Sequence, residues 1–188
     1  MQALVFNLSL PRALGLMMLG PLYPRLYYKG RLAMLRLAEV EEPEVPAPDW
    51  VKIRTRMCGY CGSDLNIMLL RDSPMATPFT SFPAVIGHEV CGEVVEIGGK
   101  VQACRPGDLV AIDPMLSCAP RGITTECRPC RSGRPANCEN LAGGKLAPGM
   151  FMGVCRDLGG GFAQYMGAHE SQIFPVPQGV SAESAMLT

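Results

Sequence analysis

The chain has 188 residues and no formal net charge at pH 7; 48% of its residues are hydrophobic and 18% are charged. This length fits one domain of ordinary size, and the apolar content excludes a disordered chain. Because the sequence as a whole has no basic excess, we expect no nucleic-acid partner. The 21 glycines and 17 prolines form about a fifth of the chain, which disfavours a helical bundle and favours short strands joined by turns.

Short strands are predicted along the chain, beginning with the mostly apolar residues 1–7. Residues 34–48 predict a strand followed by a proline-rich acidic loop, and the alternation from Val51 to Met57 predicts another strand. Later strands are predicted at 89–98, 109–112, 162–166 and 173–176. Short helices are predicted at 63–72 and 181–186, with Ser181 as the N-cap of the second. The fold class indicated is mainly β with short helices.

Residues 8–36 follow neither pattern. They mix Leu and Met with Arg, Lys and Tyr, and they contain three prolines. The favoured interpretation is a short helical excursion that packs on the strands. A segment that touches a membrane and a contact between subunits are the alternatives, and the apolar content would also suit a segment that lines or covers a cleft.

Nine cysteines are present, and an odd number cannot pair completely in disulfides within one chain. The N-terminus lacks the pattern of a signal peptide, and no stretch approaches the ~18 apolar residues that span a bilayer. We therefore expect a cytoplasmic protein without a membrane partner. In that compartment, clustered thiols more often bind metal than form disulfides.

One candidate site combines a thiol, an imidazole and a carboxylate. Cys61 precedes Ser63 and Asp64, and the pair His88 and Glu89 follows 27 residues after the cysteine. These are ligand types of a catalytic zinc, which keeps one coordination position open. The Ser63 hydroxyl could pass a proton, and the Asp64 carboxylate could hold the second ring nitrogen of His88.

A second candidate site is the run Cys127-x2-Cys130-x7-Cys138 with Cys118 upstream. Such spacing can place four thiolates tetrahedrally around a zinc ion that staples a loop without a core of its own. Four independent surface thiols are the alternative. We assign Cys91, Cys104 and Cys155 to packing. Cys58 forms a C-x2-C pair with Cys61, but we interpret it as a packing residue rather than as half of a redox pair.

The segment from Gly87 to Gly92, followed by Gly98 and Val101, fits the pattern G-H-E-x2-G-x5-G-x2-V. Together with residues 59–64 and the turn and strand at 107–110, this segment resembles the zinc-dependent alcohol dehydrogenases of the medium-chain dehydrogenase/reductase family. The resemblance covers about residues 34–188 and leaves residues 8–33 as an unusual insertion. It implies the family's N-terminal catalytic domain, a GroES-like partly open β-barrel with a four-cysteine zinc lobe.

The resemblance also implies a function, namely NAD(P)-dependent interconversion of alcohols with aldehydes or ketones by zinc-assisted hydride transfer. Cys61 and His88 correspond to catalytic zinc ligands, and Ser63 corresponds to the residue that relays the proton. Glu89 lies where the family has a carboxylate close to the metal. In the family the third ligand often follows the point where this chain stops, so Glu89 is the candidate substitute. The family's lobe usually reads C-x2-C-x2-C-x7-C, and Cys118 is the upstream thiol available here.

No G-x-G-x-x-G lies between a strand and a helix, so we expect the Rossmann NAD(P) domain after residue 188. On this interpretation the 188 residues are an N-terminal piece that is inactive alone, and the full-length enzyme is a homo-oligomer that acts on a small molecule. The competing hypothesis is a stand-alone GroES-like zinc-binding module without catalysis. A zinc-free reductase is disfavoured because the zinc ligand set is present.

Overall fold

Two antiparallel sheets organise the computed structural model, which describes residues 1–187 except for the side chain of Pro74. The three-stranded sheet has the order β2 (Leu35–Glu39), β1 (Gln2–Phe6) and β4 (Ala84–Val85). The five-stranded sheet has the order β7 (Tyr165–His169), β3 (Trp50–Gly59), β5 (Glu89–Ile97), β6 (Leu109–Ile112) and β8 (Ile173–Pro175). The mainly β fold class is therefore confirmed, and both sheets remain open.

The helices are short and lie between or after the strands. In residues 1–187 the α-helices are α1 (Leu10–Leu19), α2 (Gly62–Leu69), α3 (Arg128–Arg131) and α4 (Ala182–Met186). Short 3-10 helices occupy η1 (Pro24–Tyr27), η2 (Pro74–Phe79), η3 (Pro135–Asn137) and η4 (Glu170–Gln172). The predicted cap at the last helix is confirmed, because the Ser181 hydroxyl accepts a hydrogen bond from the Ser184 amide at 3.3 Å.

The pairing of β3 with β5 determines where the candidate catalytic residues lie. Alternate residues of β3 are apolar, and Val51 and Ile53 are completely buried. The antiparallel register begins with Val51 opposite Ile97 and ends with Gly59 opposite Glu89. The chain segments just beyond Gly59 and just before Glu89 are therefore neighbours, although they are distant in sequence.

The core consists of two clusters. The larger one includes Val51, Ile53 and Val94, and its buried residues come from all five strands of the larger sheet and from the loops that follow β5 and β6. The smaller cluster joins the three-stranded sheet to the helices α1 and α2, through the buried residues Phe6, Leu16, Met34, Ile67, Ile86 and Val154. Along the chain, His88 lies between Ile86 of the smaller cluster and Val90 of the larger one.

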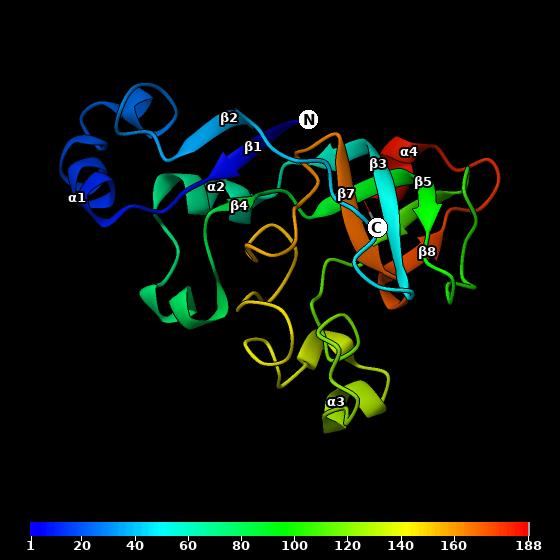
Figure 1. The fold of residues 1–188 in the computed structure, drawn as a ribbon. Helices are drawn as coiled ribbons and strands as arrows, with labels where there is room; N and C mark the ends of the chain where they lie inside the picture. Colours follow the sequence, from blue (N-terminus) through cyan, green and yellow to red (C-terminus); the bar gives the residue numbers. More distant parts are fainter. Residues whose placement is uncertain (188) are drawn as a thin grey trace.

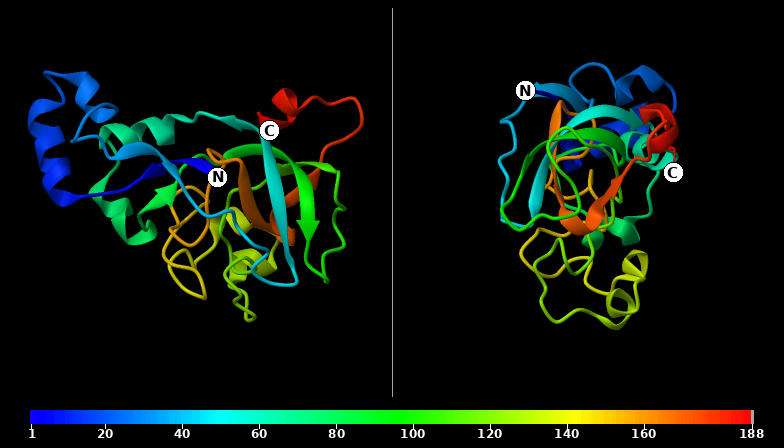
Figure 2. Two further views of the ribbon diagram at one scale, coloured as in Figure 1. Left: turned by 45° about the horizontal axis from the view of Figure 1, so that its top comes forward. Right: turned by 90° about the vertical axis from the view of Figure 1, so that its right-hand side faces the viewer.

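The segment from residue 8 to residue 33 forms α1 and η1, as the favoured interpretation predicted. It packs on the three-stranded sheet rather than on the five-stranded one, since Leu16 is buried in the smaller cluster. Figures 1 and 2 show α1 at one end of the molecule, while the five-stranded sheet lies toward the other end and the lobe that contains α3 projects to one side. Within residues 1–187, no helix is long and apolar enough to cross a membrane.

The strand predicted at 162–166 begins three residues late, at Tyr165. The reason is that Phe162 bonds to the other sheet: its amide donates to the Ile86 carbonyl at 3.0 Å, and its carbonyl accepts from the Leu4 amide at 2.8 Å. The segment thus crosses from one sheet to the other. The two-residue strand β4 was missed, because its pairing with β1 has no local pattern.

Candidate metal sites and the adjoining pocket

The turn between β3 and α2 presents Cys61 and Ser63. Cys61 is the N-cap of α2, and its amide donates to Asp64 Oδ2 at 3.1 Å in a capping box. Asp64 is 1% exposed. Because the carboxylate satisfies the helix terminus, the first turn of α2 holds the thiol and the hydroxyl in fixed positions.

The other oxygen of Asp64 fixes the opposite side of the site. Asp64 Oδ1 accepts a hydrogen bond from the Gly87 amide at 3.2 Å and lies 3.5 Å from His88 Nδ1. Gly87 has φ of +93°, a conformation that residues with a side chain rarely adopt. This left-handed residue turns the chain immediately before β5 and directs the His88 ring toward α2.

The sequence-predicted residues Cys61, His88 and Glu89 come together. One ligand atom from each lies within 4.8 Å of the others, and Ser63 Oγ lies 3.3 Å from His88 Nε2. A Cβ at Gly59 would overlap the Glu89 carboxylate, so the glycine leaves room for that side chain.

Hydrogen bonds and charges couple the groups of this site to one another. Hydrogen bonds from Ser63 lower the pKa of the Cys61 thiol, which favours the thiolate that binds metals. Burial lowers the pKa of His88, but Asp64 and Cys61 raise it by more, so the net shift is upward. His88 Nδ1 is buried without a hydrogen bond of standard geometry, and its nearest charged neighbour is Asp64. A proton on Nδ1 leaves Nε2 free as a ligand on the side of Ser63.

The four thiols of the second candidate site also meet, in the lobe around α3. The sulfur atoms of Cys118 and Cys138 are 3.7 Å apart, and those of Cys127 and Cys138 are 3.9 Å apart. A disulfide would require about 2.05 Å, whereas four sulfurs at about 2.3 Å from one zinc ion would be about 3.8 Å apart. With Cys130, all four ligand atoms lie within 4.8 Å of one another, so the donor set and its geometry fit a tetrahedral zinc.

Amide groups around the lobe point at these sulfurs. Cys118 Sγ accepts from the Cys127 amide at 3.4 Å and from Asn140 Nδ2 at 3.3 Å, and the Asn140 amide donates to Cys138 Sγ at 3.3 Å. Backbone hydrogen bonds lower the pKa of Cys127 to about 7. Donors aimed at sulfur stabilise thiolates and orient metal ligands. Sequence reasoning missed Asn140, whose only signal is its position two residues after the last cysteine.

A buried cation, Arg121, holds the loop that carries the lobe back to the body. Its side chain is completely buried, and it donates to the carbonyl oxygens of Leu116 at 2.9 Å and Gly149 at 2.5 Å. Nη1 donates to the carbonyl of Gly143 at 2.8 Å and also to those of Leu146 and Ala147. This residue was also missed, because an arginine in a loop is usually exposed.

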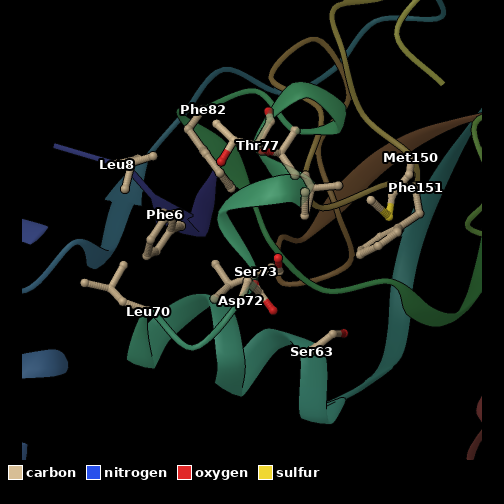
Figure 3. Close-up of a pocket in the computed structure, with 14 residues that line it drawn as sticks. Phe6, Leu8, Ser63, Leu70, Asp72, Ser73, Thr77, Phe82, Met150 and Phe151 are labelled. Carbon is tan, nitrogen blue, oxygen red and sulfur yellow. Dashed lines mark hydrogen bonds between the residues drawn. The ribbon is translucent and has the colours of Figure 1, made fainter. Parts of the chain in front are cut away.

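A pocket of about 360 Å³ adjoins the first candidate site. Figure 3 shows Ser63 and Phe151 on one side of this pocket and Phe6, Leu8 and Leu70 on the other. The Phe151 ring lies 4.7 Å from the His88 ring between centroids. The volume is in the lower part of the range for small-molecule sites. Most lining residues are apolar, and Asp72 is the one charged residue among them.

The remaining cysteines lie in packing environments, as interpreted from the sequence. Cys91, Cys104 and Cys155 are buried. Burial raises the pKa of Cys58 to about 12, so this thiol is a poor partner for thiolate redox chemistry with Cys61. All nine cysteines carry free thiols.

Residues 47–178 match a family described as "Alcohol dehydrogenase GroES-like domain". Starvation-sensing protein RspB from Escherichia coli (strain K12) is 32% identical over 150 residues, which cover 79% of this chain and 38% of that protein. The matched region therefore contains Cys61, His88 and the four cysteines between residues 118 and 138.

Two crystal structures share the fold over the whole chain. Galactitol-1-phosphate dehydrogenase from Escherichia coli has a TM-score of 0.68 and 25% identity, and it matches 100% of this chain with 41% of its own. An alcohol dehydrogenase (rspB) from Escherichia coli CFT073, complexed with NADH, has a TM-score of 0.68 and 26% identity over 100% of this chain and 41% of its own. The chain thus spans less than half the length of these relatives.

Proposed function

Because the chain belongs to the family of alcohol dehydrogenase GroES-like domains, we propose that it is the zinc-binding part of an NAD(P)-dependent oxidoreductase. The reaction is the interconversion of an alcohol with an aldehyde or ketone. The observation that carries the proposal is the meeting of Cys61, His88 and Glu89 beside an apolar pocket to which Ser63 belongs. A structural zinc bound by Cys118, Cys127, Cys130 and Cys138 completes the assignment.

In this proposal Cys61 Sγ, His88 Nε2 and a Glu89 carboxylate oxygen would hold the catalytic zinc. A bound zinc ion supplies Lewis acidity, which lowers the pKa of an alcohol at the open coordination position. Ser63 Oγ would relay the proton of that alcohol, taking it up as its own hydroxyl proton passes to solvent. Ser63 lies 3.3 Å from His88 Nε2 and also lines the pocket. Asp64 is a positioning residue, since it orients His88 and caps α2.

The pocket indicates the kind of substrate. Neither lysine nor arginine is among the described residues that line it, and Asp72 would repel an anion. Phe6, Ile67 and Phe151 offer apolar surface to the carbon skeleton of the substrate, while Ser63 belongs to the part of the pocket beside Cys61 and His88. We therefore assign a small uncharged alcohol with an apolar body, rather than a phosphorylated one.

The cofactor assignment rests on the relatives. The solved relative from Escherichia coli CFT073 is complexed with NADH, and this chain matches 41% of it. We place the nucleotide-binding domain outside these 188 residues and assign NAD or NADP as the hydride acceptor. The complete protein is proposed to be a cytoplasmic homo-oligomer.

The test uses the natural full-length protein and a panel of small apolar alcohols, with formation of reduced nicotinamide as the readout. We expect turnover, a loss of more than about 100-fold for Cys61→Ser, and retained turnover for the control Cys104→Ser. Zinc content distinguishes the two metal sites, because Cys61→Ser should remove one metal and retain the other. Absence of turnover and of nicotinamide binding, with zinc retained in the lobe, would instead establish the non-catalytic module.

A further inference from the structure

The helix α1 carries an apolar stripe on its outward face. Leu10, Leu14, Met17 and Met18 follow the spacing i, i+4, i+7, i+8, which places them on one side of a helix. Each of these side chains is between 63% and 76% exposed, whereas Leu16 on the other side is completely buried. A stripe of this kind normally faces a core, so this one lacks the cover that its composition calls for.

The loop after α1 extends the same surface. Leu22, Tyr23 and Tyr28 are more than half exposed. Among the described residues, nine of the sixteen exposed large hydrophobic side chains lie between residues 8 and 28. We name this surface the apolar cap; it consists of Leu8, Leu10, Leu14, Met17, Met18, Leu19, Leu22, Tyr23 and Tyr28. It lies at the end of the molecule that is remote from the five-stranded sheet (Figures 1 and 2).

Every charged side chain in the first 38 residues is basic. There are five such residues, and the first acidic residue is Glu39. Arg25, Lys29, Arg31 and Arg36 are exposed, and the first two lie in and beside η1 within the apolar cap. Since the whole chain is neutral, the positive charge of this segment is balanced elsewhere. Its electrostatic complement is an anionic surface.

We propose that the apolar cap is an interfacial binding surface for anionic membrane lipid. Exposed Leu, Met and Tyr side chains insert at the boundary between headgroups and acyl chains, and flanking arginines and lysines contact anionic headgroups. The expectation of no membrane partner rested on the absence of a membrane-spanning segment. A helix that lies in the membrane interface needs no such segment. Of the cap residues, Leu8 also lines the pocket, and the variants tested below leave Leu8 unchanged.

A second copy of the chain fits the surface less well. A two-fold symmetric contact places the same patch on both subunits. Such a contact would bring the Arg25 and Lys29 side chains of both copies into one interface, and like charges at an interface oppose association. An anionic bilayer would bury the apolar stripe and neutralise the positive charge together.

The first test measures sedimentation of the full-length protein with vesicles. We expect binding to phosphatidylcholine vesicles that contain phosphatidylserine, and weak binding to pure phosphatidylcholine. The double variant Leu14→Glu with Met18→Glu should reduce the bound fraction at least tenfold. Its matched control is Phe174→Glu with Leu187→Glu, which removes two exposed apolar side chains of comparable exposure on other elements and adds the same charge. The control should bind like the wild type.

The second test separates charge from apolar contact. Arg25→Glu with Lys29→Glu should weaken binding to the phosphatidylserine vesicles by more than about tenfold, and added salt should weaken wild-type binding. The control Lys100→Glu with Arg105→Glu changes an exposed lysine and an exposed arginine far along the chain and should bind normally. Circular dichroism confirms that each variant is folded.

Three results would overturn the proposal. The first is no binding of the wild type to phosphatidylserine vesicles. The second is equal loss in the cap variants and in their controls. The third is a fall in molar mass by light scattering for the Leu14→Glu, Met18→Glu protein without any change in vesicle binding, which would assign the cap to a second copy.

Discussion

Arg121 offers the sharpest test of how the cysteine lobe is held to the rest of the structure. Replacing it by Met keeps an unbranched side chain of similar length but removes every donor. The guanidinium donates to five carbonyl oxygens, of which those of Leu116, Gly143 and Gly149 are within 2.9 Å. After the change these oxygens lose a donor, and those of Leu116, Ala147 and Gly149 belong to buried residues. The cation itself, however, no longer has to be buried.

The magnitude follows from those three short bonds. A buried hydrogen bond to a charged group contributes about 1.5–3 kcal/mol, and part of that sum is returned because burial disfavours the cation and lowers the pKa of Arg121. We expect Arg121→Met to reduce the free energy of unfolding by about 3–5 kcal/mol, because each buried carbonyl oxygen left without a donor costs about 1–3 kcal/mol. A domain of ordinary stability would lose a large share of its free energy of unfolding.

Urea unfolding at constant zinc concentration measures this loss. The midpoint should fall by about 1.5–2.5 M for a slope of about 2 kcal/mol/M, which is in the usual range for small proteins in urea. Arg105→Met, at an exposed position, is the matched control and should change the free energy by less than about 0.5 kcal/mol. Arg121→Lys should lie between, because one ammonium group cannot reach all five oxygens. A loss below about 1 kcal/mol for Arg121→Met would refute the assignment of these hydrogen bonds.

Three further predictions concern the metal lobe, an ion-pair cluster and the turn before His88. Cys130→Ser should lower the zinc content by about one equivalent per chain and lower the melting temperature, and unchanged zinc content would contradict the four-thiolate site. Hydrogen bonds, first from Arg54 and second from Arg56, lower the pKa of Glu93 below its ordinary 4.5. The Glu93 carboxylate therefore stabilises the fold above that pH, and its contribution disappears as the pH falls through the lowered pKa. Glu93→Gln should therefore be less stable than the wild type at pH 7 and equal to it in acid, and a difference in unfolding midpoint that persists at low pH would argue against the ion pairs. Gly87→Ala should destabilise by more than about 1 kcal/mol, because φ is +93° and the new Cβ would lie 2.9 Å from Cys58 Sγ and Phe162. Gly99→Ala, in open space, is its control, and equal effects at the two glycines would dismiss the strain argument.

Local patterns were sufficient where neighbours in sequence are also neighbours in space. The alternation in β3 predicted its buried face, and Ser181 predicted the start of α4. The two-residue gap between Cys127 and Cys130 places both thiols on one turn around α3. In these cases the determining contacts are short-range, so periodicity and spacing carry the information.

Local patterns failed where a residue has an unusual environment. Arginine is usually found at the surface, but Arg121 is buried. Its acceptors lie up to 28 residues further along the chain. The stripe on α1 has the periodicity of a buried face, but most of its side chains are exposed. Whether a stripe is covered depends on neighbours that periodicity does not identify.

The sequence by itself determined which atoms are available as ligands: a thiol at Cys61, an imidazole at His88 and four thiols between residues 118 and 138. Their separation in sequence left open whether they meet. The tertiary structure decided this through the register of β3 against β5, which places Gly59 opposite Glu89 and brings Cys61 and His88 to one place. Likewise, Phe6, Ile67 and Val154 line one pocket only because a strand, a helix and a loop from three distant segments pack together. Strand register and packing are long-range properties, because they are fixed by hydrogen bonds and burial between segments that no local pattern links.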